Sequence, residues 1–556
     1  MKKIYISLSL IILAQICVGQ TDKKFGEIFN KKADSKIENA ISNNKSLCGA
    51  TKLPSHVDNS INKYFPLTIS QIGGSCAMAS GVGYVYTYEM NFLLDRDGKK
   101  LENNFAYMQM WNYLNEGTGK GSFAPDGWDL IEDNGVAPAS IFNIKRTDAG
   151  AKTQWLSGYD KYFEAMHYRV KSKAKFVPYP DGYKGDFVNV IPSMKQYLFD
   201  HANGSKVGGL IVFSAYADPL DCDKNYKGPS ETGYESIIAF FPKTGAHAMC
   251  FVGYDDKVEF DINKNGTIED DEKGAFVAMN SWGADWGDKG RYYVPYKLIK
   301  LKKGIEGGTG TGSKNCYIVT PEYRKPKLTF KATISHISRN DIEIRIGVSS
   351  KKNATGPEVI KNKTVMFHQG GDLYMQGIAS TGGKEIEIGI DASEFSEYIG
   401  EGKNATFFFE IVDKTFGKAG EGRLTSCSLI DYTLNPTTPK QYLSKISNPK
   451  IFENNTTIAT ISYGNVIIKE GRYFGFEYEF NNSSKKGLLK IANKENIQIN
   501  ISLVNSKGEL VKDLSNKEIK SGESTQEYDL SGIKPGSYAI KMMYKNQLNF
   551  KPFNIK

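Results

Sequence analysis

The sequence predicts an α+β domain followed by two β-sandwich domains. Between residues 53 and 323, helical stretches such as 77–94 mix with short apolar strands such as 248–252, which is the pattern of an α+β domain. Beyond residue 326 the segments 342–348 and 497–503 alternate apolar and polar residues, as strands with one buried face do. A chain of 556 residues exceeds the size of about 250–300 residues at which single cores stop growing, so several domains are expected.

The composition is that of an ordinary globular protein. Hydrophobic residues make up 40% of the chain and charged residues 24%, which excludes a disordered or fibrous protein. The net charge of +9 comes from 71 Lys and Arg against 62 Asp and Glu. Because these basic residues are spread along the whole chain and form no block, we expect no nucleic-acid partner.

Residues 1–19 predict export. Two lysines precede an apolar run over residues 4–18, which is shorter than the roughly 20 residues of a membrane-spanning helix and is typical of a signal peptide. An uncleaved membrane anchor is the alternative, and Ile16 disfavours a lipoprotein attached through Cys17. Since no later stretch is apolar enough to span a membrane, the mature chain is expected to be secreted or held at the cell surface.

The other boundaries follow from changes in composition. Residues 20–52 are rich in Lys, Asn and Ser with weak helical periodicity, and we interpret them as a short leader or pro-segment. The α+β domain is expected over 53–323 and the first β-sandwich over 326–435. A linker containing Pro and Thr is expected over 436–450, and a second β-sandwich, punctuated by turn residues, over 451–556.

Cys76 is a candidate nucleophile. The segment 71–76 ends in Gly-Gly-Ser-Cys and leads directly into the predicted helix 77–94. Unpaired N–H groups and the helix dipole at a helix N-terminus favour the thiolate, which is the nucleophilic form of cysteine. The alternative is a buried, inert cysteine, because free cysteines are often buried.

His247 and Asn280 are candidate partners of that thiol. His247 opens the short apolar strand 248–252, which is a rigid support for a side chain. Asn280 follows another apolar stretch, and its side-chain amide can accept a hydrogen bond from an imidazole and fix the tautomer. The neighbouring Trp282 can shield that bond from water.

Three motifs in this order resemble the papain-like cysteine peptidases. They are Gly-Ser-Cys over 74–76, His-Ala over 247–248, and Asn-Ser-Trp-Gly-x-x-Trp-Gly over 280–287. The resemblance covers residues 53–323 and implies a domain with a helical half and a β-barrel-like half. It also implies hydrolysis of peptide or protein substrates through a thioester acyl-enzyme without a cofactor for catalysis, with the roles nucleophile, general base and orienting residue falling to Cys76, His247 and Asn280.

The resemblance extends to further residues, with departures. The family's oxyanion-hole glutamine corresponds to Gln71, which lies one residue closer to the nucleophile than is usual, and we expect its amide to donate to the developing oxyanion. The alternative is a glutamine that only stabilises a turn. Gly73 stands where the family often has a cysteine, so no disulfide is expected there. The family also implies a disulfide between Cys222 and Cys316.

Residues 261–272 match the calcium-loop pattern D-x-[DN]-x-[DN]-G-x5-E. Such a loop surrounds a hard cation with oxygen atoms, and Gly266 supplies the sharp turn. The flanking segments resemble strands, so we expect Ca²⁺ to be a structural clip; an acidic surface loop is the alternative. The predicted ligands are Asp261, Asn263, Asn265, Thr267, Glu269 and Glu272.

The C-terminal block resembles the sorting domain of type IX secretion cargo. Its features are the turn at 505–511, the segment 529–540 containing Pro-Gly-Ser-Tyr, and a basic end. This resemblance implies secretion machinery as a partner, and a generic small β-sandwich is the alternative.

Two other functions stay open for the whole chain: a catalytically inactive surface binding or adhesion protein built on a peptidase-like domain, and an acyl transferase using the same residues.

Overall fold

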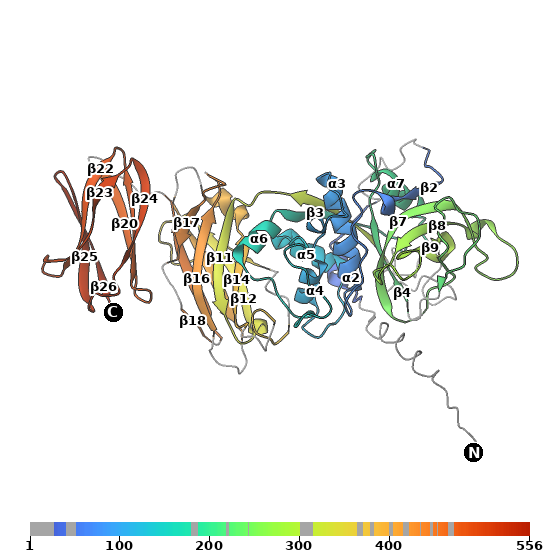
Figure 1. The fold of residues 1–556 in the computed structure, drawn as a ribbon, viewed down its shortest axis with the longest axis horizontal. Coiled ribbons are helices and arrows are strands. Elements are labelled where there is room, and N and C mark those ends of the chain that lie inside the picture. Colours follow the sequence, from blue (N-terminus) through green and yellow to red (C-terminus); the bar gives the residue numbers. More distant parts are fainter. Residues whose placement is uncertain are drawn as a thin grey trace, which may run out of the picture. The chain divides into compact units, whose positions relative to one another are not determined.

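A computed structural model describes residues 27–40, 52–179, 187–217, 222–242, 244–300, 315–363, 371–377, 383–399, 404–414, 422–433, 435–444, 449–452, 454–464 and 472–556 (Figure 1). The predicted signal peptide 1–19 lies outside these residues. The chain forms two compact units. Unit 1 runs to Lys325 and includes Ser338–Asn340 and Thr364–Gly383, and unit 2 contains the other residues up to Lys556.

The helical part of unit 1 surrounds one buried helix. Residues Cys76–Leu93 form this helix without interruption, through α2 (Cys76–Met78), the π-helical η2 (Ala79–Tyr86) and α3 (Thr87–Leu93). Small residues let its neighbours approach closely: a Cβ on Gly81 would lie 2.7 Å from the Cβ of Ala124. The other helices are α1 (Lys31–Asp34), η1 (Asn59–Ile61), η3 (Leu101–Asn103), α4 (Tyr107–Leu114), α5 (Ala124–Asn134), α6 (Tyr159–Ala165) and α7 (Ile191–Asp200).

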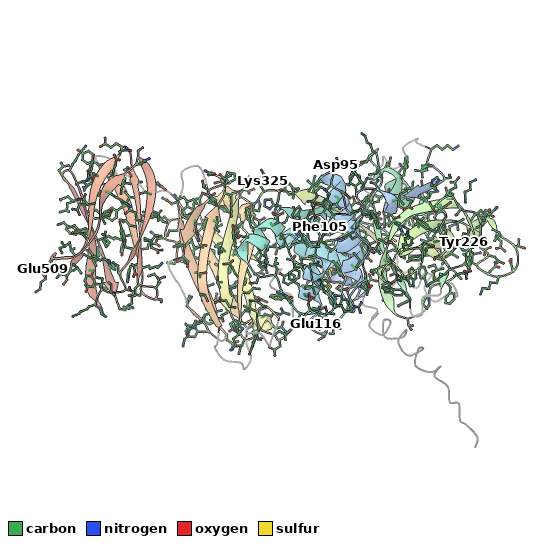
Figure 2. The ribbon with its side chains drawn as sticks, in the orientation of Figure 1. Asp95, Phe105, Glu116, Tyr226, Lys325 and Glu509 are labelled. Atoms are coloured by element: carbon green, nitrogen blue, oxygen red, sulfur yellow. The ribbon has the colours of Figure 1, made fainter. Side chains whose placement is uncertain are left out.

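Aromatic side chains fill the space between the helices and the sheet. Phe105, labelled in Figure 2, packs edge-on against Tyr86 with ring centroids 5.3 Å apart and against Tyr168 at 4.8 Å. Trp128 of α5 is fully buried and donates from its indole nitrogen to the carbonyl of Gly81 at 3.0 Å. These contacts hold the central helix rigidly in place.

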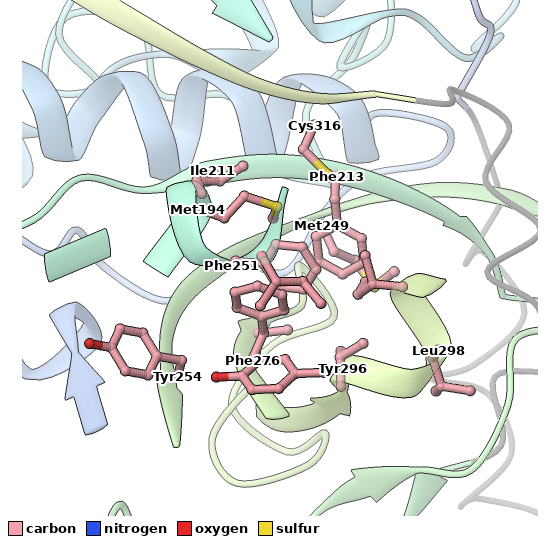
Figure 3. Close-up of a cluster of buried hydrophobic side chains, with 14 of the residues drawn as sticks. Met194, Ile211, Phe213, Met249, Phe251, Tyr254, Phe276, Tyr296, Leu298 and Cys316 are labelled. Carbon is pink, nitrogen blue, oxygen red and sulfur yellow. The ribbon is translucent and has the colours of Figure 1, made fainter. Parts of the chain in front are cut away.

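The sheet of unit 1 is mainly antiparallel and follows the order β1-β3-β10-β4-β7-β8-β9-β6-β5, with β2 paired to β7. Its hydrophobic cluster includes Phe213 stacked on Phe251 with ring centroids 3.8 Å apart, and Phe276 at 4.6 Å from Phe251 (Figure 3). The elements are β1 (Glu38–Asn39), β2 (His56–Asp58), β3 (Tyr168–Phe176), β4 (Ile211–Tyr216), β5 (Cys222–Asp223), β6 (Ile237–Ile238), β7 (Ala246–Glu259), η4 (Asp270–Glu272), β8 (Lys273–Met279), β9 (Arg291–Pro295), α8 (Tyr296–Lys300) and β10 (Cys316–Tyr323).

Unit 2 begins with two sheets, ordered β14-β11-β16-β17 with β18 on β16, and β13-β12-β15-β19. In β12 the apolar residues Ile342, Ile344, Ile346 and Val348 are buried, as the sequence pattern predicts, and Gly347 and Ser349 are buried as well. The elements are β11 (Leu328–Ser335), β12 (Ile342–Ser349), β13 (Val359–Asn362), β14 (Glu385–Asp391), η8 (Ser393–Tyr398), β15 (Ala405–Asp413), β16 (Gly422–Asp431), β17 (Lys440–Leu443), β18 (Lys450–Ile451) and β19 (Thr456–Tyr463). The short helix η5 (Arg339–Asp341) belongs to unit 1 except for Asp341.

The C-terminal part of unit 2 has two further sheets, ordered β20-β21-β24 and β23-β22-β25-β26. One hydrophobic cluster contains residues of both, including Leu489 and Ile491 from one sheet and Ile501 and Ile540 from the other, which is the packing of a β-sandwich. The strands are β20 (Phe474–Asn481), β21 (Lys486–Asn493), β22 (Ile497–Asn505), β23 (Leu510–Ile519), β24 (Gly522–Asp529), β25 (Gly536–Tyr544) and β26 (Gln547–Ile555).

The pairing of β17 and β19 moves one predicted boundary. The sequence predicts a linker over 436–450 and a new domain from 451. In the structure β17 pairs with β16 and β19 pairs with β15, so the residues up to Tyr463 complete the sheets of the preceding domain. The turn-forming residues of 435–439 lie between two strands of one domain, because turn chemistry alone does not separate a hairpin from a linker.

Candidate active site

Cys76 is the first residue of the central helix. Gly73 precedes it with φ of 54°, a left-handed conformation that favours glycine, and a Cβ on Gly74 would lie 3.0 Å from the carbonyl oxygen of Gly119. Two glycines are therefore needed to bring the chain into the helix at this point. The side chain of Cys76 is fully buried, and α2 packs against β7, the strand that carries His247.

His247 and Asn280 lie together, as the motifs predict. His247 Nε2 is 2.9 Å from Asn280 Oδ1, and the same oxygen accepts the backbone N–H of Ser281 at 2.8 Å. Because the Ser281 amide can only donate, the atom it meets is the side-chain oxygen, and His247 Nε2 must carry the proton that it donates. The other ring nitrogen, Nδ1, is then the basic one in the neutral imidazole.

Trp282 lies against His247, and Trp286 packs on Trp282. The Trp282 ring stacks on the imidazole with centroids 4.7 Å apart, and Trp286 packs edge-on against Trp282 at 5.5 Å. His247 and Asn280 are both fully buried. Burial lowers the pKa of His247 to about 4, although the hydrogen bond to Asn280 acts in the opposite direction, so the imidazole is neutral over most of the pH range.

Two side chains tie the nucleophile helix to the strands that carry its partners. Ser80 Oγ donates to the carbonyl of Ala248, next to His247, at 2.9 Å. The Tyr84 hydroxyl donates to the carbonyl of Asn280 at 3.3 Å. Because these contacts come from the helix that starts at Cys76, they fix its position relative to both strands. Neither residue could be identified from the sequence, because the sequence does not show which hydroxyl groups will donate to a carbonyl distant in the chain.

Gln71 lies at the same junction. Its Nε2 donates to the carbonyl of Gly73 at 2.8 Å, while its Oε1 accepts from Ser281 Oγ at 2.6 Å and its backbone N–H donates to the carbonyl of Ser281 at 2.8 Å. Arg146 donates to the Gln71 carbonyl at 2.8 Å. The amide is thus held with its NH₂ group toward the loop that leads into Cys76, and one of its two N–H bonds is used by Gly73.

Part of the predicted leader, residues 27–40, lies against the candidate site; we name these residues the strap. The backbone N–H of Glu27 donates to the carbonyl of Ala246, the residue before His247, at 3.2 Å. The N–H of Ile28 donates to the carbonyl of Ser122 at 3.1 Å. Glu27 and Ser122 form a parallel β-bridge, so the strap runs in the same direction as the segment around Ser122. The strap therefore binds backbone acceptors beside the candidate general base.

The strap is anchored at two further points. Asn30 Nδ2 donates to both carboxylate oxygens of Asp126 in α5, at 2.9 and 3.1 Å, and its own Oδ1 caps α1. The Asp34 carboxylate accepts hydrogen bonds of 2.8–2.9 Å from Lys175, Asn315 and Tyr317. Beyond Asp34, β1 adds a parallel strand to β3. The sequence indicated a leader but not these anchors, which depend on partners distant in the chain.

The predicted calcium loop has the turn that its pattern requires. Gly266 has φ of 81°, and the two carboxylate oxygens of Asp261 accept the N–H groups of Asn265 at 3.2 Å and Gly266 at 2.8 Å. In the part of the chain that the structure describes, no group of three or more His, Cys, Asp or Glu side chains is placed to hold a metal ion. The loop instead combines carboxylates with amide and backbone oxygens, which suit a hard cation.

Glu272, the last predicted ligand, is fully buried and makes several contacts. Its Oε1 lies 3.1 Å from Lys297 Nζ in α8, and its Oε2 accepts the N–H of Glu269 at 3.2 Å. Burial alone would raise its pKa, but these hydrogen bonds hold the pKa at about 2. Lys297 also lies 3.1 Å from Asp271, so an ammonium group stands beside the loop. Lys297 could not be predicted from the sequence, because its contact with Glu272 joins residues 25 positions apart.

One implication of the family resemblance is corrected by the structure. Cys222 and Cys316 form no disulfide; among the described residues both are thiols, as are Cys76, Cys250 and Cys427. Cys316 lies in β10, whose neighbours in the sheet are β3 and β4, whereas Cys222 lies in β5 at the edge of the sheet. Burial among hydrophobic residues raises the pKa of the Cys316 thiol to about 12, so this thiol is unreactive.

Residues 485–556 match the secretion system C-terminal sorting domain family. This domain marks type IX secretion to the cell surface or extracellular space, which confirms the predicted localisation and the resemblance of the C-terminal block. The match links the chain to secretion machinery. Among the described residues, no helix has the length and apolar character needed to cross a membrane. The search of curated proteins found no match.

The solved structures similar to this chain include several cysteine proteases. ProCathepsin B from Trypanosoma congolense is 16% identical over 54% of this chain and 87% of its own, with a TM-score of 0.35. The proform of the ragweed pollen cysteine protease Amb a 11 is 15% identical over 54% and 74%, with a TM-score of 0.32. The clostridial cysteine protease Cwp84 after propeptide cleavage is 12% identical over 74% and 100%, with a TM-score of 0.32.

Proposed function

We propose that this chain is a secreted cysteine peptidase of the papain-like type, with Cys76 as nucleophile, His247 as general base and Asn280 as the residue that orients the base. The hydrogen bond between His247 Nε2 and Asn280 Oδ1 carries the proposal, because it leaves Nδ1 as the basic nitrogen on a strand packed against the nucleophile helix. The sorting domain supplies the secreted location.

In the proposed reaction, His247 Nδ1 takes the proton of the Cys76 thiol while the sulfur attacks the carbonyl carbon of the peptide bond. The backbone N–H of Cys76 and the side-chain amide of Gln71 stabilise the oxyanion. The C–N bond then breaks, the departing amine takes the proton from His247, and a thioester remains. Water attacks the thioester and gives a proton to His247, and the C–S bond breaks to release the acid and restore the thiol.

The strap is proposed to be a pro-segment that keeps the full-length chain latent. It uses the carbonyl of Ala246 and the carbonyl of Ser122, which an extended substrate beside His247 would need. Its anchors at Asp126 and Lys175 hold it there. Glu27→Gly removes the hydrogen bond from Ser214 to the strap and adds backbone freedom, which weakens the hold of the strap on both carbonyls, so this variant is expected to be more active than the wild type.

The test is a digest of a peptide library by the full-length wild type, Glu27→Gly, and Glu27→Gly combined with Cys76→Ala. We expect cleavage by Glu27→Gly that disappears in the double variant. Cleavage that persists without Cys76 would contradict the assignment. Product analysis by mass spectrometry separates hydrolysis from transfer to an amine, and lack of both turnover and alkylation at Cys76 would favour the inactive binding protein.

We also propose that residues 261–272 bind Ca²⁺ as a structural clip between β7 and β8. The side-chain oxygens of Asp261, Asn263 and Asn265, the Thr267 carbonyl and the Glu272 carboxylate would hold the ion, with Glu269 beside them. The curved loop around Asp261 and Gly266 supports this proposal. The ion would add no chemistry to peptide hydrolysis and would stabilise the strand pair that carries the candidate site.

A further inference from the structure

Glu27 is the buried acidic residue of the strap. It is 9% exposed, whereas the next residue, Ile28, is 52% exposed. Acidic side chains are seldom buried without a polar partner. Here the Oε1 atom of Glu27 accepts a hydrogen bond from Ser214 Oγ, and the Ser214 side chain is itself fully buried.

The place that the Glu27 side chain occupies lies beside the candidate catalytic residues; we name it the Glu27 subsite. Ser214 belongs to β4 and pairs with Ala248 of β7, and the next pair along these strands is Ala215 with His247. Ser80 of the nucleophile helix donates to the carbonyl of the same Ala248. The Glu27 subsite therefore lies where the strand of the candidate base meets the helix of the candidate nucleophile.

The Glu27 subsite is polar on a second side. Glu27 forms a β-bridge with Ser122, and Ser122 Oγ is buried with no hydrogen-bond partner among the described residues. A buried hydroxyl without a partner is unfavourable, so a ligand side chain that offers hydrogen-bonding atoms gains over an apolar one. The two hydroxyls of Ser214 and Ser122 thus define the chemistry of the subsite.

A substrate must use the backbone groups that the strap now uses. The carbonyl of Ala246 adjoins His247, and the carbonyl of Ser122 lies across the strap from it; both accept backbone N–H groups of the strap. An extended peptide bound by these two carbonyls next to His247 places one side chain in the position of Glu27. The residue at that substrate position is then selected by the Glu27 subsite.

We propose that this peptidase selects substrates with a Glu or Gln side chain at the Glu27 subsite, and that Ser214 determines this preference. The inference rests on the proposed peptidase function. Glu and Gln both carry a side-chain oxygen at the same distance from the backbone as Oε1 of Glu27, so either can accept the hydrogen bond that Ser214 Oγ donates. A Leu or Val side chain would leave the Ser214 hydroxyl buried without an acceptor, and sites built to hydrogen-bond a substrate reject analogues that lack the polar group.

The closing experiment uses the full-length chain with Glu27→Gly, which vacates the subsite and retains its lining. Library digests compare this chain with versions that also carry Ser214→Ala, Ser80→Ala or Cys76→Ala. We expect Glu and Gln to exceed Leu by at least about tenfold in kcat/KM at one substrate position, and Ser214→Ala to remove most of that preference. Ser80→Ala is the matched control, since Ser80 donates only to a backbone carbonyl, and it should retain the preference.

The outcomes separate the inference from the proposed function. Cleavage that requires Cys76 but shows no preference for Glu and Gln, or a preference that survives Ser214→Ala, would overturn the inference and leave the peptidase standing. Absence of any cleavage that requires Cys76 would overturn the proposed function, and the inference with it.

A second measurement needs no turnover and follows alkylation of Cys76 by iodoacetamide in the full-length chain. Glu27→Gln retains the acceptor for Ser214 and should stay as slow as the wild type, while Glu27→Leu, which leaves the buried Ser214 hydroxyl without an acceptor and loosens the strap, should react at least about tenfold faster. Equal rates for Gln and Leu would contradict a polar subsite. The deeply buried Cys250 and Cys427 are internal controls for unfolding, since they should react at the same slow rate in all variants.

Discussion

Ser281 Oγ donates a 2.6 Å hydrogen bond to Gln71 Oε1. This bond joins the candidate oxyanion donor to the residue that follows Asn280, whose side chain binds His247. The two halves of the proposed machinery, electrostatic stabilisation and proton transfer, therefore meet at one serine. A change at Ser281 acts through the orientation of Gln71.

Gln71→Ala is expected to lower kcat by about 10²–10³ with little change in KM, because the amide contacts the charge that develops in the transition state. Ser281→Ala should lower kcat less, since it only releases the amide from its orientation. Both are measured on peptide substrates in the Glu27→Gly chain. A change in KM alone for Gln71→Ala would assign that residue to substrate binding.

Asn280→Ala is expected to reduce kcat on the order of a hundredfold, whereas Cys76→Ala abolishes turnover. Without Asn280 the imidazole loses the acceptor that fixes its tautomer, but the nucleophile and the base are still present. Steady-state kinetics of both variants provide the measurement. Equal loss in the two would mean that Asn280 has a role beyond orientation.

Acid is expected to destabilise unit 1 through His247. The pKa of this group is about 4 in the folded chain and 6.5 in the unfolded chain, so between these values the unfolded state binds the extra proton. Stability therefore falls as the pH falls from 6.5 to 4, by about 3 kcal/mol in total, and no further below that range through this group. Urea unfolding at pH 7 and 4.5 measures the loss, and His247→Gln, which cannot titrate, should show less of it.

Calcium is expected to stabilise unit 1 by about 2.7 kcal/mol at a hundredfold excess over its dissociation constant, if the unfolded chain does not bind it. Calorimetry with and without chelator should show the shift in the wild type and a smaller one in Glu272→Gln, which loses charge and the bidentate grip. Identical curves in all four cases would make 261–272 an acidic turn only.

Lys297 is expected to oppose calcium binding, because its ammonium group lies 3.1 Å from the Glu272 oxygen that the ion would need. Lys297→Met should lower the melting temperature in chelator and enlarge the stabilisation by calcium. Lys273, which contacts Asp270 at 3.0 Å and not Glu272, is the matched control position. An unchanged response to calcium in Lys297→Met would show that the lysine and the ion do not compete.

The candidate triad could be predicted from sequence because each member depends on local structure. Cys76 is the first residue of its helix, His247 lies near the start of its strand and Asn280 directly follows one, and in each case the adjoining glycines or apolar residues define the backbone. The strand pattern after residue 326 was equally local, since alternation with a period of two follows from the pleat. The sorting domain was also readable, because its turns lie in consecutive residues.

The contacts that give the site its character depend on the tertiary structure. Glu27 meets Ser214, Asn30 meets Asp126 and Glu272 meets Lys297 only after the chain has folded, and their spacing in the sequence carries no period that indicates a contact. By itself the sequence determined which residues could do the chemistry, because helix starts and strand ends are set by near neighbours. Only the tertiary structure decided what covers the site and which polar groups face it, since burial and hydrogen bonding between distant segments depend on the packing of the whole unit.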